Sequence, residues 1–243
     1  MSTTTSRPTI ATREQWRAKR VELLAKEKEL SRVRDELSRE RRELPWVAVE
    51  EEYVFQTTEG DRTLAELFGT RSQLLVYHFM YGPDWDAGCP SCSFWMDSFD
   101  GTAVHLANRD VELVVVSRAP LDVLQAYRKR MDWSFRWVSS AGSRFNHDYR
   151  VSFTDDERRD GAEYNFAFVP KPNDELPGVS VFAKDAAGAV HHTYSSYSRG
   201  LDVLNCTYQL LDLVPKGRDE DELPHPAAWL RRHDEYEDQR RAL

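Results

Sequence analysis

Residues 74–99 read LLVYHFMYGPDWDAGCPSCSFWMDSF, and this stretch decides the fold. Its first part, 74–82, is a near-continuous apolar run rich in β-formers, which predicts a strand covered on both faces. Cys89 and Cys92 follow, and apolar residues spaced by three or four then predict a helix that continues past Gly101. The carboxyl edge of strands in an α/β sheet is where reactive groups gather, so the order strand, cysteine pair, helix predicts a site at that edge.

The segments on either side continue the pattern of strands and helices. A strand from Trp46, a turn at 59–61 and a short helix ending at Gly69 precede the central stretch. Residues 133–178 are less regular and predict an insertion of loops with short ordered pieces. Further on we expect strands at 111–117 and 135–140, a helix opened by Pro120, an antiparallel hairpin of 178–185 with 188–197, and a closing helix over 200–214.

A separate helical arm is predicted before Pro45. Thr12 and Gln15 form a capping-box signature, and a single apolar stripe then repeats every seven residues. Most positions that would complete a coiled-coil seam are charged, which favours an arm packed on its own domain or on a neighbouring subunit over an autonomous coiled coil. A homodimer through this helix is therefore one expected partner arrangement. The stripe consists of Trp16, Leu23, Leu30, Leu37 and Leu44.

Composition limits the classes of function. The 243 residues are 40% hydrophobic and 12% aromatic, enough for a buried core, and the net charge of −8 argues against nucleic-acid binding. No apolar run reaches the roughly 20 residues that cross a bilayer, and the start resembles no secretory signal, so we expect a cytoplasmic protein with no membrane partner. We expect a helical arm at 1–44, a domain at 45–215 and a polar, loosely packed tail at 216–243.

Cys89 and Cys92 are the candidate catalytic residues. Backbone N–H groups and the positive dipole end of the following helix would stabilise a Cys89 thiolate, against the opposing charges of Asp84 and Asp86. We expect the dipole to prevail and the pKa of Cys89 to fall. Cys92, one turn deeper, would then resolve a mixed disulfide.

Two other interpretations of the pair remain open at this point. It could be half of a zinc site, but two more ligands are needed, and His78 and His105 lack a fixed ligand spacing to it. It could also be two inert buried thiols. Cys206 lies on a predicted apolar helical stripe with Val203, Leu210 and Leu213, which predicts a core position. We expect no metal, and the absence of a Gly-rich phosphate loop gives no reason to expect a nucleotide cofactor.

Several segments in order resemble a thioredoxin-like bacterial family of uncharacterised function: GCPSCSFW, VSRAPL, WVSS, FN-x-DY, PGVSVF, HTYS and LDLVPKGRDE. The resemblance implies an α/β, thioredoxin-like fold with an N-terminal helical arm and an insertion before the C-terminal hairpin. It also implies that Cys89 attacks and Cys92 resolves, with a protein or small-molecule thiol or disulfide as partner. Trp85 lies upstream as a substrate-binding candidate, and Gly88 stands where thioredoxins usually carry Trp.

The same resemblance singles out a proline beside the cysteines. Thioredoxin-like folds present a cis proline at the start of the strand leading the final hairpin, and Pro177 is the best match, with Pro170 a second candidate. The expected function is thiol–disulfide exchange.

Two rival functions remain. Peroxiredoxins share the fold, but their usual signature has Thr three residues before the attacking cysteine, where this chain has Asp86. Arg118, at the same sheet edge, could offset that negative charge as a substrate-binding assistant. The other rival is a redox-inactive binding protein with merely buried cysteines.

The stripe on the arm generates a first prediction. Removing residues 1–44 should lower the melting temperature or split a dimer, because the stripe's apolar partner surface becomes exposed, while the chemistry of Cys89 and Cys92 stays largely intact. Differential scanning fluorimetry and light scattering measure both effects. An unchanged melting temperature together with an unchanged oligomeric state would show that the arm packs on nothing.

Overall fold

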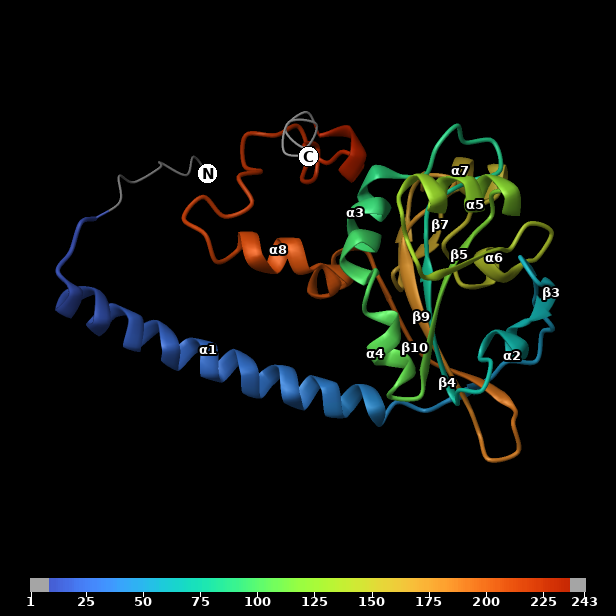
Figure 1. The fold of residues 1–243 in the computed structure, drawn as a ribbon, viewed down its shortest axis with the longest axis horizontal. Coiled ribbons are helices and arrows are strands. Elements are labelled where there is room, and N and C mark those ends of the chain that lie inside the picture. The colour runs from blue at the N-terminus through green and yellow to red at the C-terminus, as the bar shows by residue number, and fades with distance from the viewer. Residues whose placement is uncertain (1–8, 237–243) are drawn as a thin grey trace. The chain divides into compact units, whose positions relative to one another are not determined.

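The computed structural model describes residues 9–236. Internal contacts divide the chain into two compact units, Met1–Pro45 and Trp46–Leu243. The first unit contains one long helix, and the second contains the sheet (Figure 1). Cys89 and Cys92 belong to the second unit. Within the described residues, no helix is long and apolar enough to cross a membrane.

The first unit is the expected helix, α1 (Arg13–Arg42). The capping box is confirmed: the N–H of Gln15 donates to Thr12 Oγ1 at 3.2 Å, and the N–H of Thr12 donates to Gln15 Oε1 at 3.0 Å. No residue of α1 is buried, and Trp16 in the apolar stripe is 56% exposed. The arm therefore has a capped start and an apolar stripe that it cannot bury by itself.

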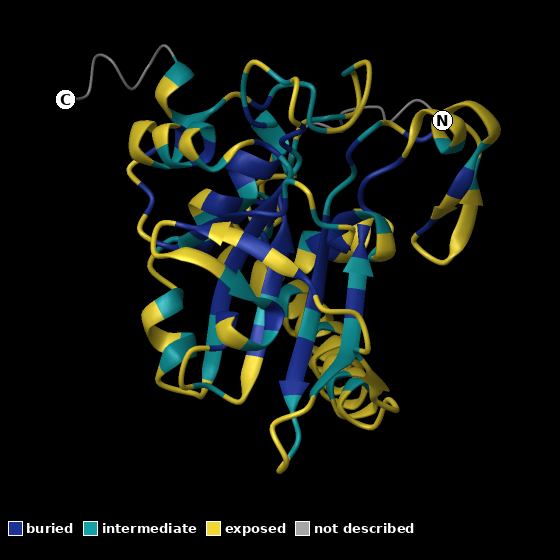
Figure 2. Cartoon of the chain, turned by 90° about the vertical axis from the view of Figure 1, so that its right-hand side faces the viewer, coloured by how far each residue is buried: buried dark blue, intermediate teal, exposed yellow. Residues whose placement is uncertain are grey.

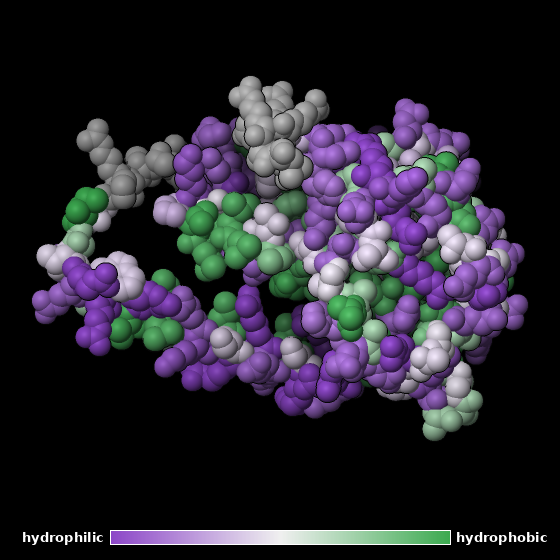
Figure 3. All heavy atoms as spheres, viewed as in Figure 1, coloured by the Kyte–Doolittle hydropathy of each residue, from purple (hydrophilic) through white to green (hydrophobic). Residues whose placement is uncertain are grey.

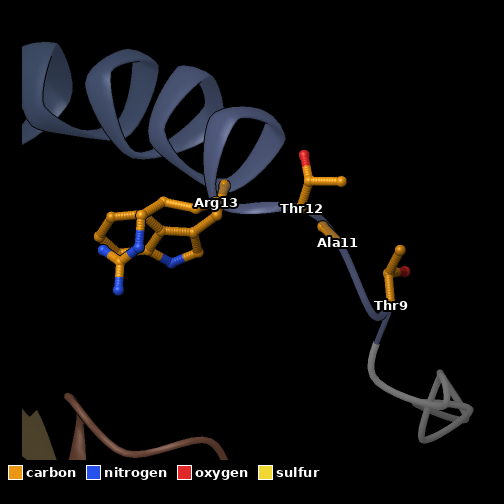
Figure 4. Close-up of a pocket in the computed structure, with 5 residues that line it drawn as sticks. Thr9, Ala11, Thr12 and Arg13 are labelled. Atoms are coloured by element: carbon orange, nitrogen blue, oxygen red, sulfur yellow. The ribbon is translucent and has the colours of Figure 1, made fainter.

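An open pocket lies beside the first turn of α1 (Figure 4). It contains no thiol, carboxylate or imidazole, so its lining offers none of the usual groups for nucleophilic or acid–base chemistry. The lining residues are Thr9, Ala11, Thr12, Arg13 and Trp16.

The second unit is built on a mixed sheet. Its central strands β4, β5 and β6 are parallel, whereas β9 runs antiparallel to β4 and β10 antiparallel to β9. This arrangement confirms the α/β class and the expected hairpin. Among the described residues the strand order is β1 (Val47–Ala48), β10 (Val190–Tyr197), β9 (Gly178–Lys184), β4 (Gln73–His78), β5 (Val111–Ser117), β6 (Arg136–Ser139), β2 (Val54–Thr57) and β3 (Gly60–Thr63).

Helices connect and cover these strands. The parallel crossovers run through α3 and α4 between β4 and β5, and through α5 between β5 and β6, and α2 follows the β2–β3 hairpin. The insertion before the final hairpin carries two short helices and a small separate hairpin. The bounds are α2 (Leu64–Leu67), α3 (Pro90–Phe99), α4 (Ala103–Ala107), α5 (Leu121–Arg130), α6 (Phe145–Asp148), α7 (Asp155–Asp160), β7 (Ala162–Tyr164), β8 (Ala167–Val169), the 3₁₀ helices η1 (Ser198–Leu204) and η2 (His233–Glu235), and α8 (Cys206–Leu211).

The two faces of the sheet bury two different clusters, because successive side chains of a strand point to opposite faces. From β4, Tyr77 joins the cluster that holds Cys92 and the helices α3 and α5. Leu74 and Val76 join the other cluster, which holds α2 and Phe145 of α6. Figure 2 shows the buried residues concentrated in the central strands. The apolar run of β4 is thus covered on both faces, as predicted, and the fold is thioredoxin-like.

Two predicted helices are interrupted. The helix after the cysteines ends at Phe99, because Asp100 is extended and Gly101 adopts φ +80°, and α4 begins only at Ala103. The closing helix is divided at Asn205, whose extended backbone separates η1 from α8. In both cases the spacing of apolar residues predicted one continuous helix, but the backbone conformation of an intervening residue ends the helix.

The prediction that Cys206 is a core residue is wrong. Cys206 is exposed, because α8 is short and buries Tyr208 instead. The apolar residues that accompany Cys206 also face outward, and they gather over η1 and α8 (Figure 3). They are Val203, Leu204, Leu210, Leu213 and Val214.

The described part of the tail, 216–236, contradicts the prediction of loose packing. Leu230 is only 4% exposed and packs with Phe94 of α3 and Tyr208 of α8. The chain after Leu230 then runs back along the cysteine-bearing helix. A buried apolar anchor therefore fixes a segment whose composition is polar.

Candidate active site

The cysteine pair lies where β4 gives way to α3. Cys89 is the N-cap residue of α3 and Pro90 its first helical residue, a position where the missing proline N–H costs nothing. The N–H of Cys89 donates to the carbonyl of Met80 at 3.1 Å. The N–H of Ala119, beyond β5, donates to the carbonyl of Tyr81 at 2.9 Å. Backbone hydrogen bonds thus fix the turn that presents the thiols to the carboxyl edge of the sheet.

Gly88 is required by close packing directly before Cys89. A Cβ at this position would lie 2.8 Å from Cε1 of Phe79 and 3.2 Å from Cζ of Tyr127. The buried aromatic rings therefore occupy the space that any larger residue needs. This packing explains why Gly, rather than Trp, precedes the first cysteine in this chain.

The half-buried thiol of Cys89 is an acidic one. Its pKa falls to about 7, mainly because the Cys92 thiol donates a hydrogen bond to it, with further hydrogen bonds from the backbone N–H groups of Cys92 and Ser91; burial opposes the shift. The predicted direction is confirmed. The backbone N–H groups contribute as predicted, but the largest cause is the Cys92 thiol, which the sequence did not indicate. Asp84 and Asp86, which were expected to oppose the shift, are exposed.

Cys92 is fully enclosed behind Cys89. Its pKa is raised well above the ordinary value because burial disfavours its thiolate, and the hydrogen bond to Cys89 acts in the same direction. The N–H of Met80 donates to Cys92 Sγ at 3.4 Å, and the hydroxyl of Tyr77 donates to the same sulfur. The two cysteines therefore differ in acidity in the order that an attacking and a resolving thiol require.

A chain of hydrogen bonds supports the turn from the other side. Ser93 Oγ donates to the carbonyl of Cys89 at 2.9 Å and lies 2.9 Å from the hydroxyl of Tyr127. Arg232 donates from Nε to the Tyr127 hydroxyl and from Nη2 to the carbonyl of Gly88, both at 2.7 Å. Nothing in the sequence of the polar tail indicated Arg232.

Trp85 reaches across to the insertion. Its indole Nε1 donates to Asp174 Oδ2 at 2.7 Å, and the ring lies against Gly82, where a Cβ would come within 2.9 Å of Nε1. The side chain is half-buried and, like Cys89, packs against the cluster that holds Cys92. Trp85 thus joins the loop before Cys89 to the insertion.

The peptide bond before Pro177 is trans, since none of the peptide bonds in residues 9–236 is cis. The expected cis geometry at Pro177, and that of the second candidate Pro170, is therefore wrong. Gly178 pairs with His78 at the end of β4, so Pro177 does lie at the carboxyl edge of that strand. The Tyr164 hydroxyl donates to the Pro177 carbonyl at 2.8 Å, which holds this segment by a side chain of the insertion.

Arg118 is paired with a carboxylate. Its Nη1 lies 3.0 Å from Oε1 of Glu175, which is 2% exposed and also accepts a hydrogen bond of 2.6 Å from Ser152. Burial raises the pKa of Glu175 to about 7, and the hydrogen bonds and the charge of Arg118 offset this only in part. The structure thus gives Arg118 a partner in the insertion.

Metal ligands do not gather at the cysteines. Within residues 9–236, no group of three His, Cys, Asp or Glu side chains is placed to hold an ion. His78 points away from the thiols, lies 2.8 Å from Ser180, and has a pKa lowered to about 3 by burial. In the described part of the chain, the two sulfurs interact with each other, with backbone N–H donors and with the Tyr77 hydroxyl.

Comparison with known proteins gives a family. The family described as "Bacterial protein of unknown function (DUF899)" matches residues 5–236. No curated protein matches the sequence.

Solved structures with similarity to the chain include three peroxiredoxins. Peroxidoxin BcpB from Mycobacterium tuberculosis is 13% identical, with 69% of this chain and 96% of that chain covered and a TM-score of 0.43. Peroxiredoxin Q from Xanthomonas campestris is 12% identical, with coverages of 65% and 94% and a TM-score of 0.45. The mitochondrial 2-Cys peroxiredoxin from Plasmodium falciparum is 14% identical, with coverages of 68% and 92% and a TM-score of 0.40. At these identities the similarity concerns the fold alone.

The packing at Gly88 generates a prediction about stability. Gly88→Ala should lower the free energy of unfolding by about 1 to 3 kcal/mol, because the added methyl group overpacks against Phe79. Urea denaturation measures the change. Introduced together with Phe79→Leu, the same substitution should cost less than it does alone, and equal costs in both backgrounds would show that Phe79 is not the obstacle.

The burial of Glu175 generates a prediction about pH. Its pKa of about 7 in the folded chain lies above the ordinary 4.5, so the folded state binds the proton more tightly, and stability falls as the pH rises from 4.5 to 7. The loss is on the order of 3 kcal/mol. Denaturant unfolding gives the free energy of unfolding of the wild type and of Glu175→Gln at each pH in this range. The loss is the change with pH in the difference between these two free energies. Parallel curves would contradict the assignment.

Proposed function

The chain belongs to this bacterial family of unknown function, and we propose that it catalyses thiol–disulfide exchange through Cys89 and Cys92. The observation that carries the proposal is the hydrogen bond from a buried, weakly acidic thiol to a half-buried, acidic one. This pairing supplies a nucleophile that forms at neutral pH and a second sulfur close enough to replace it.

The first step uses the Cys89 thiolate. It attacks one sulfur of a protein or small-molecule disulfide, forms a new S–S bond to Cys89, and releases the other sulfur of the substrate as a thiolate that takes up a proton from water. Once Cys89 is part of the mixed disulfide, its sulfur is no longer an anion and no longer holds the hydrogen bond from the Cys92 thiol. Cys92 is then free to lose its proton and act as the second nucleophile.

In the second step the Cys92 sulfur attacks Cys89, and the substrate's remaining sulfur leaves as a thiolate and is protonated. The result is a Cys89–Cys92 disulfide and two substrate thiols. Two electrons pass from the pair to the substrate, and the two protons of the dithiol balance those gained by the substrate. The N–H of Met80 and the hydroxyl of Tyr77 stabilise the charge that develops on Cys92.

The interpretation of the pair as inert buried thiols is weaker on chemical grounds. Inert buried thiols would both have raised pKa values, whereas the pKa of Cys89 is lowered. Reduction of a peroxide would use the same two sulfurs, with a sulfenic acid on Cys89 before the disulfide. The two functions are therefore distinguished by whether a disulfide or a peroxide oxidises the cysteine pair faster.

Substitution of each cysteine tests the roles. Cys92→Ser should accumulate a mixed disulfide at Cys89 when mixed with a disulfide substrate, because no second sulfur releases it. Cys89→Ser should show no exchange. Non-reducing gel shift and intact mass measure both, with Cys206→Ser, which changes an exposed thiol outside the pair, as the matched control. A Cys92 that reacts faster than Cys89 at neutral pH would reverse the assignment.

A second experiment, on the wild type, separates thiol–disulfide exchange from peroxide reduction. Stopped-flow oxidation of the reduced wild type by a small disulfide and by hydrogen peroxide gives two rate constants, and the proposal requires the disulfide to be the faster oxidant. A sulfenic acid on Cys89 that forms faster than any mixed disulfide would favour the peroxide.

A further inference from the structure

The last described residues form a strap along the cysteine-bearing helix. We define the C-terminal strap as residues 229–236. Leu230 anchors its start in a buried apolar cluster with Phe94 and Tyr208. Two ion pairs anchor its end, because Arg130 of α5 lies 2.7 Å from Asp234 and 3.0 Å from Glu235.

Arg232 lies between these anchors and points into the turn that carries the thiols. Its side chain is 15% exposed. Nη2 donates to the carbonyl of Gly88 and Nε to the hydroxyl of Tyr127, both at 2.7 Å, and Nη1 pairs with Glu235 at 2.9 Å. The guanidinium is therefore held against the residue that directly precedes Cys89.

The donor-only nature of Arg232 sets the direction of the hydrogen-bond chain. A guanidinium can only donate, so the Tyr127 oxygen accepts from it and gives its single proton to Ser93 Oγ. Ser93 Oγ then gives its own proton to the carbonyl of Cys89, which agrees with the 2.9 Å contact between them. The hydroxyls of Tyr127 and Ser93 thus each have one defined orientation, and this series of hydrogen bonds ends at the carbonyl of Cys89.

We propose that Arg232 is a positioning residue for Cys89, brought to the site by the C-terminal strap. It acts on two backbone carbonyls, that of Gly88 directly and that of Cys89 through Tyr127 and Ser93. This role rests on the function proposed above and extends the site to a residue 143 positions from Cys89 in the sequence.

Two effects follow from this position. The first is geometric, since the first turn of α3 must be held for the N–H groups of Ser91 and Cys92 to face the Cys89 sulfur. The second is electrostatic, because a positive charge next to Gly88 favours the thiolate of the following residue. Both effects promote the anionic form of Cys89, so loss of Arg232 should make that thiol less acidic.

Attachment of the strap does not depend on Arg232 alone. Leu230 is buried on one side of it, and Arg130 holds Asp234 and Glu235 on the other. A variant at Arg232 can therefore keep the strap in place while it loses the contacts to Gly88 and Tyr127. This separation makes the proposed role distinguishable from a purely structural one.

The test compares Arg232→Met with the wild type, in full-length chains that also carry Cys206→Ser. The readouts are the pH profile of Cys89 alkylation by iodoacetamide and the reduction potential of the pair in glutathione buffers. We expect the pKa of Cys89 to rise, with about threefold less thiolate at pH 6. The reduction potential should become more negative, because the reduced form loses stabilisation.

Two variants serve as matched comparisons. Arg231→Met removes a neighbouring arginine whose guanidinium donates to the carbonyls of Ala228 and Leu230, and it should leave the alkylation profile and the reduction potential unchanged. Arg232→Lys keeps the charge without the fork of donors and should shift the pKa less than Arg232→Met does. If Arg232→Met does not fold, Tyr127→Phe breaks the same chain and should shift the pKa of Cys89 in the same direction.

The outcomes separate this inference from the proposed function. A wild type without a reversible Cys89–Cys92 disulfide would contradict the proposed function. A wild type with that disulfide, combined with an Arg232→Met chain whose profile and potential match it, would overturn only the role of Arg232. Equal shifts in Arg231→Met and Arg232→Met would overturn it as well, because the effect would then belong to the strap's charge in general.

Discussion

The hydrogen bond from the Cys92 thiol to the Cys89 sulfur is the interaction on which the candidate site depends. It lowers the pKa of Cys89 and raises that of Cys92, so one contact favours the thiolate of Cys89 and the protonated thiol of Cys92. The contact exists because Cys89 caps α3 and Cys92 lies in its first turn, with the sheet behind it. A half-buried nucleophile in front of a buried thiol is the arrangement that thiol–disulfide exchange requires.

The surrounding packing maintains that contact. Phe79 and Tyr127 fill the space in front of Gly88, and the carbonyl of Met80 accepts from Cys89. The insertion closes another side, where Trp85 bonds to Asp174. The turn is thus held by segments before it, after it and far along the chain, so its geometry is a property of the whole second unit.

The sequence predicted what local patterns control. The apolar run of β4, the capping box of the arm and the hairpin of β9 and β10 follow from the spacing of residue types, and the structure confirms them. Predictions failed where a single backbone angle, or a single contact between residues far apart in the sequence, determines the local structure. Gly101 ends a helix that the apolar spacing continues, and Leu230 packs a tail whose composition is polar. Arg232 had no signal, because pairing between residues 88 and 232 leaves no trace in a single sequence.

Thiol titration of the whole chain against a series of redox buffers tests the central claim most directly. Intact mass, followed by peptide mapping, gives the fraction of chains that have lost two hydrogen atoms and the cysteines that are joined. The account predicts one two-electron transition, fully reversible, with the disulfide between Cys89 and Cys92 and with Cys206 outside it. Oxidation that joins Cys206 to either of them, or a Cys89–Cys92 pair that stays reduced throughout the series, would contradict it.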